Sequence, residues 1–512
     1  MSNQDLRHKR LVRGIAKGAG VVFIATIIAR ILGYVIRMSI ARIYGPEGYG
    51  LVSTSLALFT IASTVALLGF TNSLTRQISY YLNTDRAERV KSLIFSAYGI
   101  SSTLAIVAGT IIFIFSDQLA VNTFNNPKLT IFLKYFGASI FFFVWIKLAA
   151  SIFKAYKRMI WYTLTQDVFR FGAILIAVLL VILLHQPVKS LGFAYFAAFL
   201  VVGVLGTVAA IYMTPVKKYP AESPFSEAPN LFAFSWPLML ASIIHMFLFR
   251  VDILMIGYFL NQTQVGIYNA AVPIGQLLTI IISSFTPFLL PTMTEYFAQN
   301  DIDNLNKTFA ISTKWVFLFT IPAFSLMLFF PDFFLVVIFG KQFLEAALVL
   351  QIISAGFLLA ASVGPTGNLL ITVGKTHLNL INNLVVIVIN IVLNLLLIPR
   401  FGIYGAAIAS GFSYAFLNIL ALVEIYWMHG IQPYTPVYLR IGAIALLAGF
   451  GLSQLYDPER FWTGFILFII YAGIYFAGLK LTGCFDPDDQ IIFREFEKRY
   501  NRSLDWLKRL LR

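Results

Sequence analysis

KGAGVVFIATIIARILGYVIRMSIARIY, residues 17–44, sets the class of structure to which this chain belongs. It is long enough to cross a bilayer as a helix, because a span needs about 20 predominantly apolar residues. Arg30 and Arg37 lie inside it. A guanidinium near the centre of a membrane helix costs about 2.5–3.5 kcal/mol, which the surrounding Val, Ile and Leu residues offset. The stretch is therefore predicted to be a membrane helix that carries two cations.

Arg30 and Arg37 are seven residues apart, which is two helical turns, so they share one face of this helix. Two cations on one face of a membrane helix favour a polar, water-filled interior lined by that face. For Arg37 the alternative is a position close enough to the outer interface for its head group to reach water, as expected for Arg42. Arg30 lies near mid-span and favours the interior.

The rest of the composition agrees with a membrane protein. The chain has 512 residues, of which 59% are hydrophobic and 12% charged, and its mean hydropathy is +0.81. Soluble proteins carry about 25% charged residues, so a soluble globular protein is excluded. Because apolar runs near 20 residues recur along the chain, the sequence predicts an all-α integral membrane protein with about fourteen transmembrane helices.

The formal charge of +15 does not indicate nucleic acid as a partner, because the basic residues cluster at helix ends and not on one face. Alternate loops are rich in Lys and Arg, which predicts a multi-pass plasma-membrane protein with both termini cytoplasmic. The single Cys484 excludes an intramolecular disulfide and a cysteine metal site, and no cofactor is expected. The basic amino-terminal arm leading into a full span is typical of an uncleaved signal-anchor.

A proline-rich stretch, PVKKYPAESPFSEAPN, divides the first twelve predicted spans into two sets of six. Two further spans and a tail follow the second set. The predicted organisation is an amino-terminal arm, an N-lobe, a linker, a C-lobe, a pair of extra helices and a cytoplasmic tail, at residues 1–17, 18–214, 215–230, 231–430, 431–482 and 483–512.

The two sets of six spans have similar sequences. GYGLVSTSL after the first span is echoed by QVGIYNAAV after the seventh, and SLGFAYFAAF by YGAAIASGF. Both echoes have nearly the same offset, which indicates a duplication. With six spans in each unit, the repeats are expected to be related by an axis along the membrane normal. Chance similarity is the alternative, because Gly and Ala recur on any helix-packing surface.

Further charges lie inside other predicted spans. The seventh span carries His245, Arg250 and Asp252, and mirrors the first span as the opening helix of its repeat. Arg250 and Asp252 are two residues apart, so they point to different faces and do not simply neutralise each other. A lone histidine such as His245 is more often a satisfied core residue than a proton relay.

The fourth and fifth spans add Lys147, and Asp167 with Arg170. The i,i+3 spacing of Asp167 and Arg170 favours an ion pair on one helix face, structural first and interior-lining second. Arginines outnumber carboxylates inside the spans, which predicts an anionic cargo, because a guanidinium binds phosphate in a bidentate manner. Asp167 and Asp252 are alternatives for a coupling ion, H⁺ or Na⁺, and the sequence does not decide between these ions.

The tail, IIFREFEKRYNRSLDWLKRLLR, has an apolar stripe with Arg and Lys on its other faces. It is predicted to be an amphipathic helix on the anionic cytoplasmic leaflet, and a partner-binding helix is the alternative. The stripe consists of Phe493, Phe496, Tyr500, Leu504, Leu507 and Leu511.

Two motifs carry a family resemblance. The first span runs into ARIYGPEGYG, which fits an "ARxxGPExYG" turn, and RVDILMIGYFLNQTQVGIYNAAVPI contains "VGxYxxA" beginning at Val265. In these stretches the chain resembles the polysaccharide-transport flippases, which handle lipid-linked oligosaccharides and belong to the multidrug/oligosaccharidyl-lipid/polysaccharide (MOP) exporter superfamily. The resemblance implies two six-helix lobes related by pseudo-two-fold symmetry around a V-shaped central cavity, with two extra carboxy-terminal helices. It further implies alternating access, with Arg30, Arg37, Arg250 and Asp252 as substrate-binding candidates.

The expected function is translocation of a polyprenyl-diphosphate oligosaccharide from the cytoplasmic to the outer leaflet, by a monomer and without enzymatic chemistry. The bilayer, the lipid-linked glycan and polysaccharide-assembly enzymes are the expected partners. A multidrug cation antiporter of the same superfamily is one alternative, although cationic drugs favour interior carboxylates. A membrane-embedded polysaccharide polymerase or glycosyltransferase is another, although the sequence has no large outer loop and places no DxD motif or nucleotide-binding Gly-rich turn after a strand. The secondary site candidates are Lys147, Asp167, Arg170 and His245.

Overall fold

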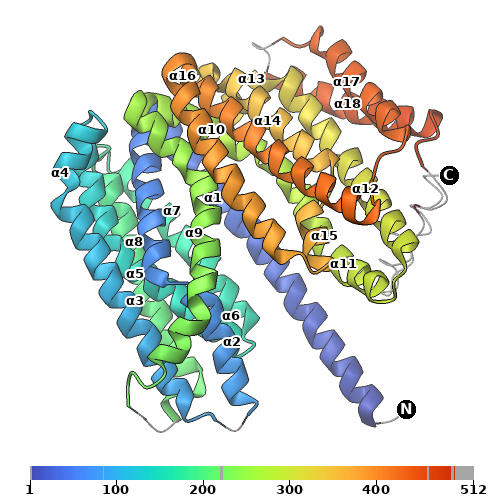
Figure 1. Cartoon of the computed structure of the whole chain (residues 1–512). Helices are drawn as coiled ribbons and strands as arrows, with labels where there is room; N and C mark the ends of the chain where they lie inside the picture. The colour runs from blue at the N-terminus through green and yellow to red at the C-terminus, as the bar shows by residue number, and fades with distance from the viewer. Residues whose placement is uncertain (1–2, 85, 219–222, 458–460, 486–488, 490–512) are drawn as a thin grey trace. The chain divides into compact units, whose positions relative to one another are not determined.

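The computed structural model describes residues 3–84, 86–218, 223–457, 461–485 and 489. These residues form helices, short helical turns and connecting loops, with no strand among them (Figure 1). They divide between two compact units, residues 1–266 and 267–512. The predicted boundary between two six-helix lobes at 215–230 stays a prediction, as does the V-shaped cavity.

The first unit is a helical bundle. Two of its turns, η1 and η2, are π-helical, and η3 is a 3₁₀ turn. α10 (Gln262–Gly275) begins in this unit. The other elements are α1 (Asn3–Leu67), α2 (Phe70–Leu82), α3 (Arg89–Ile114), α4 (Ser116–Gln118), η1 (Leu119–Thr123), α5 (Leu129–Ala155), α6 (Met159–Thr163), η2 (Leu164–Val168), α7 (Phe169–Leu183), α8 (Ser190–Met213), η3 (Pro215–Lys218) and α9 (Ala228–Phe259).

The second unit continues from α10. Its elements are α11 (Leu277–Ala298), α12 (Ile302–Phe329), α13 (Pro331–Ile338), η4 (Lys341–Ala346), α14 (Ala347–Ser362), α15 (Thr366–Thr372), α16 (Thr376–His429), α17 (Val437–Ser453) and α18 (Phe461–Leu481).

In the described part of the chain, 10 helical segments are long and apolar enough to cross a membrane. Two of them, Ile24–Leu82 and Thr376–His429, have 59 and 54 residues, whereas one crossing needs about 20. Each is interrupted by a glycine with positive φ, Gly45 at 71° and Gly402 at 59°. Such a backbone breaks the helix where a chain would turn between spans. The prediction of an all-α membrane fold is confirmed, while the count of fourteen stays a prediction.

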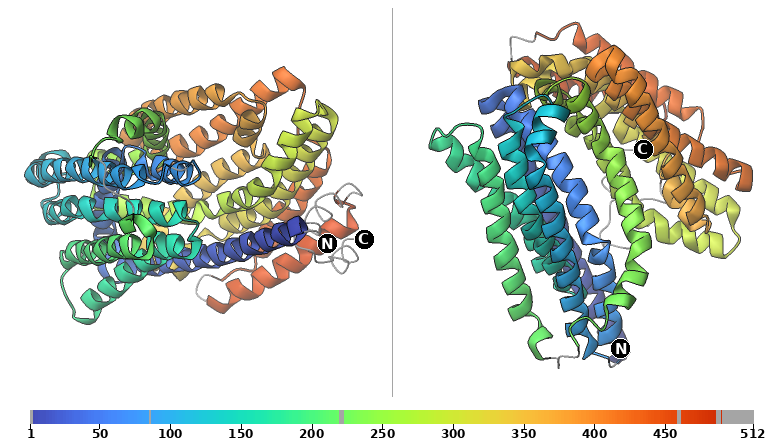
Figure 2. Two further views of the ribbon diagram at one scale, coloured as in Figure 1. Left: turned by 90° about the horizontal axis from the view of Figure 1, so that it is seen from below. Right: turned by 60° about the vertical axis from the view of Figure 1, so that its left-hand side comes forward.

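α5 lies at the centre of the first unit and packs against α1, α2, α3 and α8. Figure 2 shows the helices of this unit, blue to green, running side by side. The ring of Phe59 on α1 meets Phe136 and Phe143 on α5 and Phe199 on α8, with centroids 5.8, 5.0 and 5.1 Å away. Aromatic pairs at such distances add to the free energy of burial. This cluster fixes the part of α1 that follows Gly45 against the bundle.

In the second unit, α17 packs along α12, and α18 packs along α17. The hydroxyl of Ser325 on α12 donates to the carbonyl oxygen of Ala445 at 2.8 Å, and that of Tyr475 donates to the carbonyl of Leu318 at 2.8 Å. Lys314 on α12 forms a buried ion pair of 2.7 Å with Asp489, which follows α18. α17 and α18 are therefore held within this unit by polar contacts as well as by apolar packing.

The side chain of Asp301 caps the start of α12 by accepting a hydrogen bond from the amide of Asn304 at 3.1 Å. Bonds from the side chain and the amide of Asn304 hold the pKa of Asp301 below its ordinary value. The predicted amphipathic tail lies outside the described residues from residue 490 onward, as do the side chains of the amino-terminal arm 1–17.

Candidate functional site in the first unit

The predicted arginine face of α1 lies against α7. Gly33 is on the same face as Arg30 and Arg37, and a Cβ built on it would lie 3.6 Å from the Phe171 ring. Arg30 is exposed and Arg37 is half-buried, with its guanidinium 5.8 Å from the centroid of Tyr34. Tyr34 interacts electrostatically with both arginines. The face that was predicted from the spacing thus carries both cations in the structure.

α9 brings Arg250 to this face, because α9 packs along α1 and α2. Arg250 is half-buried and interacts electrostatically with Arg37 and with Tyr49, which is buried. Among the residues whose side chains are described, neither Arg37 nor Arg250 is paired with a carboxylate. Two cations that repel each other without such a partner make a region to which an anion is attracted.

Asp252 and His245 are the other two candidates on α9. Asp252 is 6% exposed and makes its contacts inside the protein. Its burial differs from that of Arg250, as expected for residues two apart on a helix. The side chain of His245 lies outside the described ones.

Lys147, Asp167 and Arg170 form a second charged group, within the bundle of α5 to α8. Arg170 pairs with Asp167 at 3.4 Å, so the ion pair predicted from their spacing is confirmed. Arg170 also donates from Nε to the Gln166 carbonyl at 2.8 Å, and its guanidinium lies 4.2 Å from the centroid of Phe171. Lys147 interacts electrostatically with both members of the pair.

Tyr195 on α8 connects the two groups. It is 5% exposed, and it interacts electrostatically with Tyr49 and Arg37 on one side and with Arg170 on the other. The structure therefore brings Arg30, Arg37 and Arg250 into one group, and Lys147, Asp167 and Arg170 into a neighbouring one.

The π-helical turn η2, which carries Asp167, was not predicted from the sequence. Such turns are rare and occur frequently at functional sites. This one adds a residue between α6 and α7 and sets the direction of the Asp167 side chain relative to α7. No local sequence signal distinguishes LTQDV from an ordinary helical turn.

The two motifs of the family resemblance meet in the first unit. A Cβ on Gly50 of α1 would collide with the carbonyl oxygen of Gln262 in α10, and one on Gly266 would collide with the carbonyl oxygen of Pro46. Beside this crossing, the Thr54 hydroxyl donates to Oε1 of Gln262 at 2.6 Å, and both residues are buried. Gly50 and Gly266 occupy the same position in GYGLVSTSL and QVGIYNAAV, so the repeated sequence marks a backbone-to-backbone contact.

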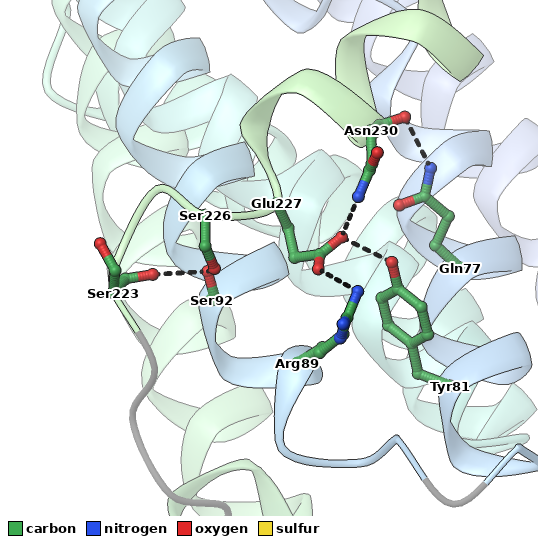
Figure 3. A network of polar contacts seen from close by, with 8 residues as sticks. All are labelled: Gln77, Tyr81, Arg89, Ser92, Ser223, Ser226, Glu227 and Asn230. Atoms are coloured by element: carbon green, nitrogen blue, oxygen red, sulfur yellow. Dashed lines mark hydrogen bonds and ion pairs between the residues drawn. The ribbon is translucent and has the colours of Figure 1, made fainter.

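A polar network at the start of α9 was also not predicted from the sequence (Figure 3). Glu227 is 2% exposed, and its carboxylate accepts from the Tyr81 hydroxyl at 2.5 Å, from Nδ2 of Asn230 at 3.0 Å and from Arg89 at 3.2 Å. The backbone carbonyl oxygen of Asn230 in turn accepts a hydrogen bond from Nε2 of Gln77 at 3.2 Å. The network joins α9 to α2 and α3, and so fixes the end of the helix that carries Arg250.

Ser92 extends the network toward the preceding loop. Its hydroxyl donates to the Ser223 carbonyl at 2.8 Å and lies 2.8 Å from the hydroxyl of Ser226. The loop that precedes α9 is therefore hydrogen-bonded to α3 as well (Figure 3).

We expect Glu227→Ala to lower the free energy of unfolding by about 2 kcal/mol, because a buried donor left without its acceptor costs about 1–3 kcal/mol. The matched control is Glu47→Ala. Its ion pair with Lys128 is 3.0 Å long with side chains 41% and 62% exposed, and an exposed pair contributes about 0–1 kcal/mol. Thermal unfolding of the detergent-solubilised chain measures both. Equal losses for the two variants would contradict the network as an anchor of α9.

The fold defines a multi-pass α-helical membrane protein, with cations placed on its helices. Residues 15–297 match a family described as polysaccharide biosynthesis protein, and residues 237–396 match the MatE family. The first match covers more than half of the chain. The chain belongs to this polysaccharide biosynthesis family, within the MOP exporter superfamily.

Two curated relatives are similar to this chain. An uncharacterized membrane protein of Methanocaldococcus jannaschii, MJ1068, is 23% identical over 93% of this chain and 97% of its own length. The probable low-salt glycan biosynthesis flippase Agl15 of Haloferax volcanii is 26% identical over 50% of this chain and 54% of its own length.

Solved structures share the fold. The lipid II flippase MurJ in an inward closed conformation aligns with a TM-score of 0.68 at 16% identity, over 90% of this chain and 99% of its own. A multidrug resistance MATE transporter in an inward-facing conformation aligns with a TM-score of 0.66 at 11% identity, over 78% and 94%. By name, Agl15 and MurJ are flippases and the MATE protein is a transporter.

Proposed function

We propose that this protein is a flippase that moves a polyprenyl-diphosphate oligosaccharide from the cytoplasmic to the outer leaflet by alternating access. The observation that carries the proposal is the placement of Arg37 and Arg250. They come from separate helices, are half-buried, interact with each other, and have no carboxylate partner among the described side chains. The family and the flippase relative Agl15 support the same cargo class.

Cations inside the spans suit a cargo whose charged head group has to cross the bilayer. A sugar head group on a diphosphate cannot cross about 30 Å of hydrocarbon unaided, because every hydroxyl and charge loses its hydration. The lipid tail need not leave the bilayer. In the proposed mechanism a hydrated interior receives the head group, and Arg30, Arg37 and Arg250 bind the diphosphate through paired N–H donors.

The coupling ion and the orientation belong to the same proposal. Uptake of H⁺ or Na⁺ at Asp252 or Asp167 would bias the return of the empty carrier. We place the protein in the plasma membrane with both termini cytoplasmic, as the distribution of Lys and Arg predicts.

The MatE match over 237–396 favours one alternative, a multidrug antiporter. A cationic drug would meet Arg37 and Arg250 rather than carboxylates in the first unit, and like charges repel. For this reason the flippase is the better-supported function.

Reconstitution tests the proposal. The purified chain is placed in liposomes with a polyprenyl-diphosphate disaccharide that carries a fluorophore on its sugar, and the inner-leaflet probe is followed by quenching with membrane-impermeant dithionite. We expect the probe to become accessible at least tenfold faster than in protein-free liposomes. Equal rates would refute the flippase, and export of a cationic dye by the same vesicles would favour the antiporter.

A further inference from the structure

Lys147 is a cation that diphosphate binding by Arg37 and Arg250 does not explain. It lies on α5, is half-buried, and has its Nζ 5.5 Å from the centroid of Phe143. Phe143 is four residues toward the amino-terminal end of α5, whereas the nearer end of the helix is Ala155. The ammonium thus points toward the middle of the helix, and it does not extend toward the nearer interface as an interfacial lysine does.

Arg170 lies against the same ring. Its guanidinium carbon is 5.9 Å from the centroid of Phe143, and the ring itself is held by Phe59 and Phe199. A cation over an aromatic face gains about 0.5–2 kcal/mol, and here two cations share one ring. Their mutual repulsion offsets part of that gain.

The charges around Phe143 do not balance. Asp167 is bound to Arg170 and can neutralise one of the two cations. In the part of the chain whose side chains are described, the ammonium of Lys147 has neither a hydrogen-bond acceptor nor an ion-pair partner. A lysine inside a membrane span without such a partner is costly, so this position is expected to serve a ligand or a polar pathway.

We propose that Lys147 and Arg170 form a second anion subsite, which receives a carboxylate on the sugar part of the cargo, so that the transported glycan is acidic. This inference rests on the proposed flippase function. Arg170 reaches the Arg37 group through Tyr195, but no direct interaction joins Lys147 or Arg170 to Arg250 among the described side chains. The subsite is therefore adjacent to the diphosphate group and separate from it, as a sugar is adjacent to the diphosphate in such a molecule.

The charge balance supports an acidic glycan. Among the candidate site residues of this unit, five are cations and two are carboxylates, namely Arg30, Arg37, Lys147, Arg170 and Arg250, and Asp167 and Asp252. The excess is three positive charges, whereas a diphosphate diester carries two negative ones. One cation is left over, and a single carboxylate per glycan unit would compensate it.

The test compares two probes that differ only in one acid group. One is a polyprenyl-diphosphate oligosaccharide that contains a glucuronic acid, and the other carries the same sugar with its carboxylate reduced to the alcohol. Binding in detergent and transport in liposomes are measured for the wild type, Lys147→Gln, Lys147→Arg and the control Lys154→Gln. Lys154 is on the same helix and also lies over an aromatic ring, with Nζ 5.5 Å from Tyr162.

We expect the wild type to bind the acidic probe about tenfold more tightly than the neutral one. Lys147→Gln should abolish this preference, Lys147→Arg should restore most of it, and Lys154→Gln should leave it unchanged. Thermal unfolding within a few degrees of the wild type would show that Lys147→Gln is folded.

Two results would overturn the subsite. One is equal wild-type affinity for the two probes, whether or not either is transported. The other is an equal loss of affinity for both probes in Lys147→Gln, together with weaker binding of polyprenyl diphosphate that carries no sugar. That result would show that Lys147 binds the diphosphate. If no probe is transported but the wild type still binds the acidic probe more tightly than the neutral one, the proposed flippase function is refuted and the subsite is not.

Discussion

Arg250→Ala is expected to slow flipping of a lipid-linked glycan about a hundredfold, and Arg37→Ala to a similar degree. Removing one partner of a buried, hydrogen-bonded charge pair costs about 2–5 kcal/mol, and each 1.36 kcal/mol corresponds to a factor of ten. A guanidinium gives phosphate two parallel N–H donors, which a lysine cannot replace. Arg37→Lys and Arg250→Lys should therefore recover only part of the activity.

The stability of these variants should move in the opposite direction from their activity. Arg37 and Arg250 repel each other in the folded protein, so loss of either charge removes an unfavourable interaction. We expect the melting temperature of Arg250→Ala, measured without cargo, to be equal to or above that of the wild type. A purely structural arginine would instead lower both activity and stability.

Arg158→Ala is the matched control. Arg158 is exposed in the turn before α6, in the same unit, and its removal should leave flipping within about twofold because exposed substitutions have small effects. The double variant Arg37→Ala/Arg250→Ala should lose less than the sum of the single losses in free energy, because both side chains bind one diphosphate. Wild-type flipping by either single variant would remove Arg37 and Arg250 from the site.

The sequence could predict those features that depend on spacing within one helix. The all-α membrane fold follows from the apolar runs, the shared face of Arg30 and Arg37 from their seven-residue separation, and the pairing of Asp167 with Arg170 from an i,i+3 step. Each of these depends on geometry that an α-helix fixes by itself.

Features that depend on contacts between distant helices were not predictable in the same way. Nothing in the residues around Glu227 shows that Tyr81 and Arg89 will lie beside it, since they are more than 130 residues away. The approach of Arg250 to Arg37 was expected only through the duplication of the two sets of spans and through the family resemblance. The π-helical turn at Asp167 depends on how α6 and α7 are held by their neighbours, and helix propensity does not encode that.

Gly50→Ala is expected to lower the free energy of unfolding by about 3 kcal/mol or more, at the upper end of overpacking costs. The added methyl group would meet the carbonyl oxygen of Gln262, which belongs to a helix backbone and cannot rotate away as a side chain can. Thr54 and Gln262 form a buried hydrogen bond beside this crossing, so separating the helices would also weaken that bond.

Gly172→Ala gives this prediction a control of opposite sign. Gly172 lies in α7 of the same unit, and a Cβ there meets nothing within 4 Å. Alanine in a helix is favoured over glycine by about 0.5–1 kcal/mol, so Gly172→Ala should raise the melting temperature while Gly50→Ala lowers it. Gly50 lies in the helical part of α1 after the kink and has no positive φ, so alanine is also favoured there by the backbone. A lower melting temperature for Gly50→Ala alone would therefore report steric contact with α10, and equal temperatures for the two variants would show that the two motifs do not cross this closely.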